Sequence, residues 1–266
     1  MTLGREFAAF GLMLQKDRDR ILHSRDEFKV INLGGTAIGT GINAPKNYKD
    51  IVEKKLREIT KIDFITARDL IEATQSTGAH VQISGILKRA AVKLTKICND
   101  LRLLSSGPRA GINEINLPKM QPGSSIMPGK VNPVIPEVVN QVCFLLIGND
   151  TTITMAAAGG QLQLNVFEPV IIFSLLNSIN LLQNANITLA TKCIDGITAN
   201  RDICKNFVLN SIGLVTALNP KIGYEKSAEV AKIALDSNRS IVEVVLEKGY
   251  LTKDELDLML QIENMI

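Results

Sequence analysis

The sequence predicts an all-α fold, a bundle of long helices with a small helical C-terminal domain. Apolar side chains recur at steps of three and four residues over residues 81–104, the spacing that keeps them on one face of a helix. From residue 138 to residue 191 only Asp150 and Glu168 carry charge, so the helices there are apolar nearly all round. No alternation of strands with helices is visible, and a parallel sheet is therefore not expected.

The first part of the chain predicts a helix over residues 1–23, with Phe7 and Phe10 among the apolar residues at helical spacing. This helix has no N-cap residue before its first turn, which indicates that the chain begins inside an element. After it we expect a short amphipathic helix over residues 48–59, a polar irregular segment over 64–77, and the long helix over 81–104.

A glycine-rich segment, residues 34–44, contains Gly39, Gly41 and Ala44 in the spacing GxGxxA. A dinucleotide site would need a helix to open at this turn, with an acidic residue about 20 residues further on. Pro45 and Asn47 interrupt such a helix. We therefore favour a turn in which small residues let two backbone segments approach closely.

Two long apolar helices are expected over residues 136–158 and 167–194. A helix that is apolar all round must be covered on every side. At a rise of about 1.5 Å per residue each would span roughly 30–40 Å, more than the other helices of one chain can cover. The sequence therefore predicts a homo-oligomer whose subunits share the helical bundle.

The uncharged segment 169–191 is also long enough to cross a membrane. It contains several amides, which would be costly in hydrocarbon. These amides are Asn177, Asn180, Gln183, Asn184 and Asn186. A buried helix in a soluble protein is the better interpretation, and no membrane partner is expected.

From about residue 198 the helices become short and charged, which predicts a bundle domain over residues 1–199 and a C-terminal domain over residues 200–266. Thr252 and Glu255 have the spacing of a capping box. We expect helices over 201–209, 224–235, 240–247 and 252–260, and a break at 218–220.

Composition excludes several classes of partner. The chain has 30 basic and 27 acidic residues, interspersed, for a net charge of +3, so no nucleic-acid surface is indicated. The four cysteines form no CxxC pair and suggest buried, reduced thiols in a cytoplasmic protein. The two histidines, His23 and His80, lack metal-ligand spacing, so no metal site is predicted.

Residues 123–133, GSSIMPGKVNP, form the most informative loop in the chain. Lys130 and Asn132 could hold one carboxylate together, and backbone N–H groups near Ser125 could turn toward an anion. Ser124 has no local histidine or acid to activate it, so its alkoxide would need backbone donors. A phosphate loop does not fit, because Val131 stands where a magnesium-binding hydroxyl belongs. A plain surface loop remains the alternative.

This loop closely resembles the signature of the aspartase/fumarase superfamily, and the resemblance extends over essentially the whole chain. It is most similar to the aspartate ammonia-lyases of that family. The other matching stretches are LGGTAIGTG within 33–45, 136–142, GGQLQLNV at 159–166, CIDGITAN at 193–200, and 210–220.

The resemblance implies a reversible elimination of ammonia from L-aspartate to give fumarate, with no cofactor and with divalent-metal activation left undecided. It implies that Ser124 is the base that removes the proton next to the β-carboxylate. Lys130, Asn132 and Ser125 would bind the substrate, and Glu137 matches the acid that pairs with a histidine in the family. A helix N-terminal acid is the alternative for Glu137.

The resemblance also implies a tetramer, with each active site assembled from three subunits. It further implies that this chain begins just after the family's substrate-binding Thr-His segment, so we expect this chain to be inactive by itself. Fumarate hydratase, with water as the leaving group, is the second hypothesis. A non-catalytic helical scaffold is the third.

Overall fold

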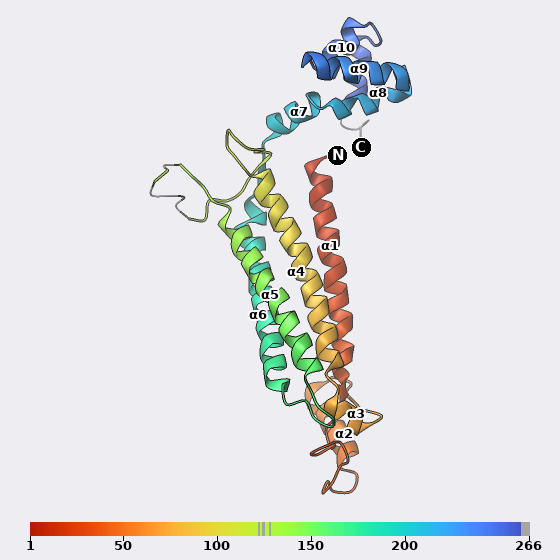
Figure 1. The fold of residues 1–266 in the computed structure, drawn as a ribbon, viewed down its shortest axis with the longest axis vertical. Helices are drawn as coiled ribbons and strands as arrows, with labels where there is room; N and C mark the ends of the chain where they lie inside the picture. Colours follow the sequence, from red (N-terminus) through yellow and green to blue (C-terminus); the bar gives the residue numbers. More distant parts are fainter. Residues whose placement is uncertain (122, 124–125, 128, 262–266) are drawn as a thin grey trace. The chain divides into compact units, whose positions relative to one another are not determined.

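A computed structural model describes residues 1–121, 123, 126–127 and 129–261 (Figure 1). They are mostly helical, and the predicted all-α fold is confirmed. The chain divides into two compact units. The larger unit comprises Phe10–Arg102 and Pro118–Gly196, and the smaller comprises Met1–Ala9, Leu103–Leu117 and Ile197–Ile266. The predicted boundary between residues 199 and 200 stays a prediction.

The longest helices of the described chain run side by side as a bundle (Figure 1). They are α1 (Leu3–Ser24), α4 (Gly78–Leu104), α5 (Val134–Ala158) and α6 (Glu168–Lys192). The predicted apolar face of α4 is buried, with Ala91, Leu94 and Cys98 among its most enclosed residues. The α5–α6 turn is closed by Asn165, whose amide donates to the carbonyls of Ala156 and Ala157 at 3.0 and 3.3 Å.

Buried polar side chains fix how these helices align. The Asp150 carboxylate on α5 accepts hydrogen bonds from Ser84 Oγ at 2.7 Å and Lys88 Nζ at 2.6 Å, both on α4. Asn149 Nδ2 donates to Ser178 Oγ on α6 at 3.0 Å. A shift of one helix along another would leave these buried groups unpaired, so they specify one register.

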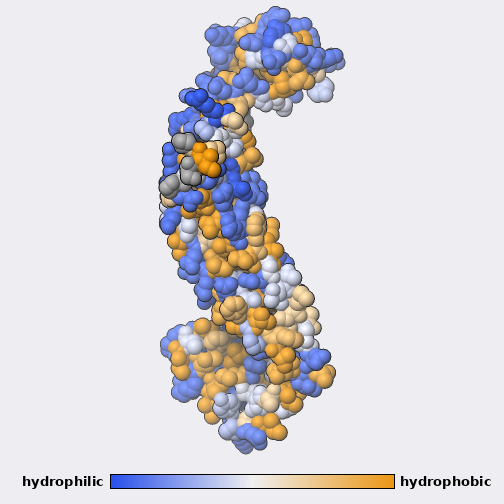
Figure 2. Space-filling view, turned by 60° about the vertical axis from the view of Figure 1, so that its left-hand side comes forward, coloured by the Kyte–Doolittle hydropathy of each residue, from blue (hydrophilic) through white to orange (hydrophobic). Residues whose placement is uncertain are grey.

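One face of α5 and α6 remains apolar and exposed. Figure 2 brings this side forward and shows hydrophobic residues gathered along it. The most exposed large apolar residues there are Phe144, Leu145, Met155, Phe173, Leu176 and Ile187. The stretch from Glu168 to Gly196 is also long and apolar enough to cross a membrane, with 33% of its most apolar window buried within this chain.

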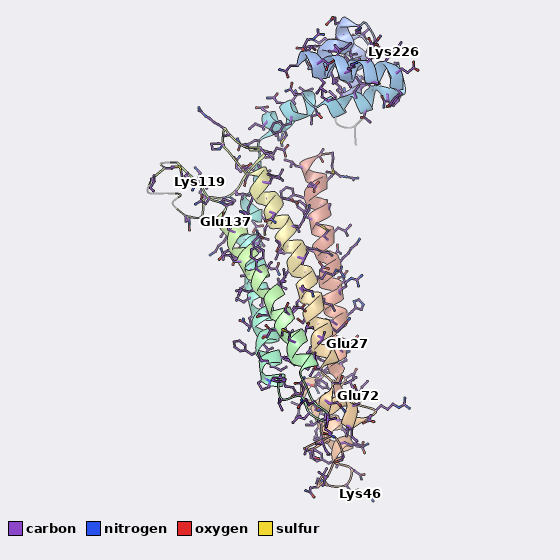
Figure 3. The ribbon with its side chains drawn as sticks, viewed as in Figure 1. Glu27, Lys46, Glu72, Lys119, Glu137 and Lys226 are labelled. Atoms are coloured by element: carbon purple, nitrogen blue, oxygen red, sulfur yellow. The ribbon has the colours of Figure 1, made fainter. Side chains whose placement is uncertain are left out.

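The glycine-rich segment packs against α3 (Leu70–Gln75). Figure 3 labels Lys46 beside this segment and Glu72 on α3. A Cβ on Gly39 would lie 2.3 Å from the Leu70 carbonyl oxygen, and its φ of +85° also favours glycine. The predicted close approach of two backbone segments is confirmed.

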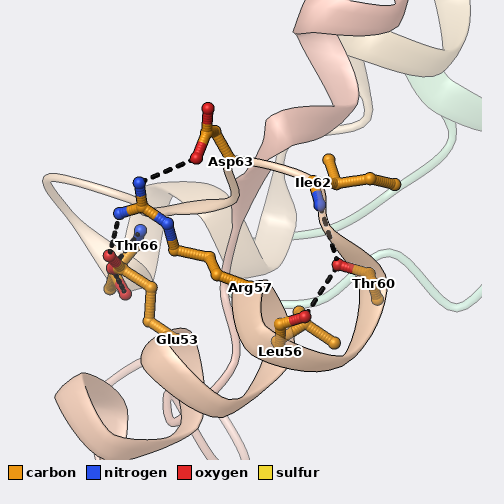
Figure 4. Close-up of polar contacts among 7 residues, drawn as sticks. All are labelled: Glu53, Leu56, Arg57, Thr60, Ile62, Asp63 and Thr66. Atoms are coloured by element: carbon orange, nitrogen blue, oxygen red, sulfur yellow. Dashed lines mark hydrogen bonds and ion pairs between the residues drawn. The ribbon is translucent and has the colours of Figure 1, made fainter.

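Helix α2 (Tyr48–Thr60) is tied to the short strand β2 (Ile65–Thr66) by side chains (Figure 4). Glu53 accepts hydrogen bonds from Thr66 Oγ1 at 2.6 Å and Thr66 N at 2.8 Å, which hold the pKa of Glu53 below its ordinary value. Strand β2 pairs in parallel with β1 (Val30–Ile31), which follows the 3-10 turn η1 (Arg25–Lys29).

The smaller unit contains the short C-terminal helices and the antiparallel pair of β3 (Ile115–Asn116) with β4 (Thr198–Ala199). Turn η2 (Ile194–Gly196), at the end of the larger unit, precedes β4. The helices are α7 (Arg201–Leu209), α8 (Val215–Ile222) after η3 (Ile212–Leu214), α9 (Tyr224–Ser237), α10 (Ile241–Glu247) and α11 (Lys253–Met259). The predicted capping box of Thr252 and Glu255 is confirmed.

The predicted break at residues 218–220 is wrong, because α8 continues through Pro220. The proline removes one backbone donor, which would otherwise reach the Thr216 carbonyl. Leu218, just before it, is completely buried in the core of this unit. Burial of that side chain offsets the loss of one hydrogen bond.

Candidate active site

The signature loop leads directly into the first turn of α5. The Val134 N–H donates to the Asn132 carbonyl at 2.9 Å, and the Glu137 N–H donates to the Pro133 carbonyl at 3.1 Å. Pro136 lies in this first turn, where its missing N–H costs nothing. The loop is therefore anchored to a rigid helix of the bundle.

The ends of the loop meet at a narrow neck. A Cβ on Gly123 would lie only 1.3 Å from the Lys130 carbonyl oxygen, so no other residue fits there. Asn132 Nδ2 donates to the Gly123 carbonyl across the neck at 3.4 Å. Gly129 has a φ of +80°, which turns the chain before Lys130.

The structure places the predicted site residues as follows. Ser124 and Ser125 lie outside the described residues. Lys130 is exposed and Asn132 is half-buried, and both lie in the segment that leads from the loop into α5. Glu137 is half-buried in the first turn of α5, where Figure 3 labels it. Lys130, Asn132 and Glu137 thus lie on one continuous segment, a cation and an amide followed by an acid at a helix N-terminus.

One polar pair beneath this site was not identified from the sequence. Asn140 is buried one turn beyond Glu137, and its Nδ2 donates to Asn99 Oδ1 on α4 at 2.8 Å. Arg102 also donates to that oxygen, at 3.3 Å. The sequence does place the amide of Asn140 inside an apolar helix. Because a buried amide requires a hydrogen-bonding partner, that placement could have predicted the pair.

The thiols do not supply a nucleophile. Burial raises the pKa of Cys98 to about 12 and that of Cys193 to about 11. Burial also raises the pKa of Cys143. These cysteines therefore stay protonated at neutral pH, as the predicted buried thiols should. In the described part of the chain, no group of three or more His, Cys, Asp or Glu could hold a metal ion.

Comparison with known families gives two matches. Residues 1–148 match the family described as lyase, and residues 214–266 match the fumarase C C-terminus. The chain is 64% identical over all 266 residues to the aspartate ammonia-lyase of Helicobacter pylori strain 26695, of which it covers 57%. It is 57% identical to the aspartate ammonia-lyase of Escherichia coli K12, of which it covers 56%.

Solved structures agree with these matches. The crystal structure of a fumarate lyase:delta crystallin from Brucella melitensis bound to cobalt has a TM-score of 0.94 and 54% identity, covering 97% of this chain and 56% of that one. The class II fumarase of Schistosoma mansoni has a TM-score of 0.91 and 34% identity, covering 98% of this chain and 58% of that one. The chain spans a little over half the length of each of these relatives.

Proposed function

We propose, because this chain belongs to the lyase family of the aspartase/fumarase superfamily, that its protein converts L-aspartate reversibly to fumarate and ammonia. The observation that carries this proposal is the signature loop, anchored on α5, in a chain 64% identical to an aspartate ammonia-lyase. The substrate would be a small dicarboxylate, and the protein would be cytoplasmic.

The proposed base is Ser124, which removes a proton from the carbon next to the β-carboxylate. The electron pair of that C–H bond moves into the carboxylate and makes an enolate-like dianion. When the dianion collapses, the carbon–carbon double bond forms and the carbon–nitrogen bond breaks, releasing ammonia. The extra negative charge exists only after proton removal. Hydrogen-bond donors and cations held beside that charge therefore stabilise the transition state more than the substrate, which lowers the barrier.

Lys130 supplies the charge that binds this carboxylate, with Asn132 and Ser125 as hydrogen-bonding partners. In the described structure the Asn132 amide donates to the Gly123 carbonyl at 3.4 Å, a long hydrogen bond that a substrate carboxylate could replace. Glu137 acts in support at the start of α5, where the helix dipole favours a carboxylate.

The active protein is proposed to be a homotetramer. The exposed apolar face of α5 and α6 supports this proposal, because large contiguous apolar faces in proteins are usually covered. Small polar residues on the same helices, such as Asn177, would then hydrogen-bond across the shared bundle and fix its register.

An assay of the protein that carries this sequence tests the proposal. Fumarate absorbance is followed with L-aspartate and, separately, with L-malate. We expect turnover of aspartate and its loss on Ser124→Ala. Turnover of malate but not aspartate would replace the proposal with fumarate hydratase. Full activity after simultaneous replacement of Ser124, Lys130 and Asn132 would favour the scaffold hypothesis.

A further inference from the structure

A polar pair joins α4 to the early turns of α5, the helix on which the signature loop is anchored. Asn140 Nδ2 donates to Asn99 Oδ1 at 2.8 Å, and Arg102 Nη1 donates to the same oxygen at 3.3 Å. Asn140 is only 3% exposed, whereas Asn99 and Arg102 lie on the surface. The pair therefore ties α5 to α4 one turn beyond Glu137.

The direction of these hydrogen bonds is set by Arg102. A guanidinium only donates, so it turns the oxygen of the Asn99 amide toward itself. The same oxygen accepts from Asn140, and this fixes which side of the Asn140 amide faces Asn99. The other side, Asn140 Oδ1, is buried and has no hydrogen-bond partner among the described residues.

Stability alone does not favour an amide at position 140. A buried acceptor without a partner lowers the free energy of unfolding, and a leucine of similar size would bury apolar surface instead. Asn99 is exposed, so water could replace Asn140 as the donor to its oxygen. A buried polar group that is kept at such a cost calls for a functional explanation.

The start of α5 has few other directional contacts. Its N-cap, Pro133, makes no side-chain capping hydrogen bond. The carboxylate tie of Asp150 to α4 lies ten residues beyond Asn140, roughly 15 Å along the helix. Between them lies the weaker contact of the Cys143 thiol with Thr95. Asn140 is therefore the amide that sets how the start of α5 is directed against α4.

We infer that Asn140 is a positioning residue for the proposed reaction, on which this inference rests. Glu137 lies one turn before it, and Lys130 and Asn132 lead directly into the same helix. A shift of the helix start would displace all three of these side chains. A displacement of about 1 Å is enough to slow an enzyme by on the order of a hundredfold.

Aspartate turnover and urea denaturation of the full protein test this role. Asn140→Leu should lower kcat about tenfold or more, with the urea midpoint unchanged or raised, because the orphan acceptor is removed. A residue that only stabilised the fold would give the opposite pattern, a lower midpoint with kcat retained. Asn149→Leu is the matched control, since Asn149 is an amide of the same helix nine residues further from the loop, bonded to Ser178. It should keep the parental kcat.

Variants of Asn99 test the direction of the hydrogen bond. Asn99→Asp keeps an oxygen that accepts from both Asn140 and Arg102, so its kcat should stay within about twofold of the parental value. Asn99→Leu removes that oxygen and should lose as much activity as Asn140→Leu. The double leucine variant should lose no more than either single variant, because all three break the same contact.

The outcomes separate this inference from the proposed function. A parental kcat in Asn140→Leu, in a protein that converts L-aspartate, would overturn the inference and leave the proposed function standing. Equal losses in Asn99→Asp and Asn99→Leu would also overturn it, because the acceptor would then be irrelevant. A parent protein that converts neither L-aspartate nor L-malate would contradict the proposed function, and the inference would fall with it.

Discussion

The side-chain amide of Asn132 donates to the backbone carbonyl of Gly123 at 3.4 Å, joining the two ends of the signature loop. The same ends touch through the backbone, since a Cβ on Gly123 would overlap the Lys130 carbonyl. The two ends of the loop therefore lie together just before α5, with Lys130 and Asn132 beside Gly123. Its geometry depends on a glycine at position 123.

Gly123→Ala should remove most of the activity, and the clash with the Lys130 backbone should lower the free energy of unfolding by about 1–3 kcal/mol, the usual cost of overpacking. The added methyl group would force the neck apart and displace Lys130 and Asn132. The measurements are aspartate turnover by the protein that carries this sequence, and its denaturation by urea.

Gly85→Ala is the control for this substitution. Gly85 lies within α4, and a Cβ there meets nothing within 4 Å. The alanine should raise the free energy of unfolding by about 0.5–1 kcal/mol without changing activity. Equal activities of Gly123→Ala and the parent protein would contradict the importance of the neck.

Asn165→Ala should destabilise the α5–α6 turn by about 1–3 kcal/mol, measured by urea denaturation. The amide donates to Ala156 and Ala157 carbonyls, and its oxygen accepts from the Phe167 N–H at 2.9 Å. Asn165→Asp keeps the acceptor but loses both donors, so it should also destabilise. Unchanged stability of both variants would mean that water replaces the amide.

Alkaline pH should destabilise the bundle through its buried thiols. The pKa of Cys98 is raised from 9.0 to about 12 in the folded chain. Because the folded state holds the proton more tightly, this contribution to stability is complete below pH 9.0 and is lost as the pH rises toward about 12. Denaturation curves across this range should show a smaller loss for Cys98→Ala. The same slope in both proteins would contradict the assignment.

Much of the bundle could be predicted from the sequence because periodicity reports burial directly. The apolar spacing of α4 and the near absence of charge in α5 and α6 located all three helices. The short helix α3 was not resolved, since its six residues contain too few turns to show a period. Pro220 misled the prediction because burial of Leu218, a tertiary effect, outweighs a local preference.

Less of the candidate site could be predicted from the sequence. Residue types suggested that Lys130 and Asn132 bind an anion, but nothing local indicated what activates Ser124. The Asn99–Asn140 pair depends on residues from two helices distant in sequence. Only the packing of the helices brings those residues together. The division at residues 199 and 200 and the roles of the loop residues remain our proposals.

The central claim is that the protein eliminates ammonia from L-aspartate with Ser124 as the base. The most direct test is the exchange of the substrate's β-carbon hydrogen with solvent deuterium, alongside fumarate formation, in the parent protein and in Ser124→Ala. We predict fumarate formation in the parent, and loss of both exchange and fumarate in the variant, with its fold retained by circular dichroism. Fumarate formation from L-aspartate at the parental rate in Ser124→Ala would contradict the account.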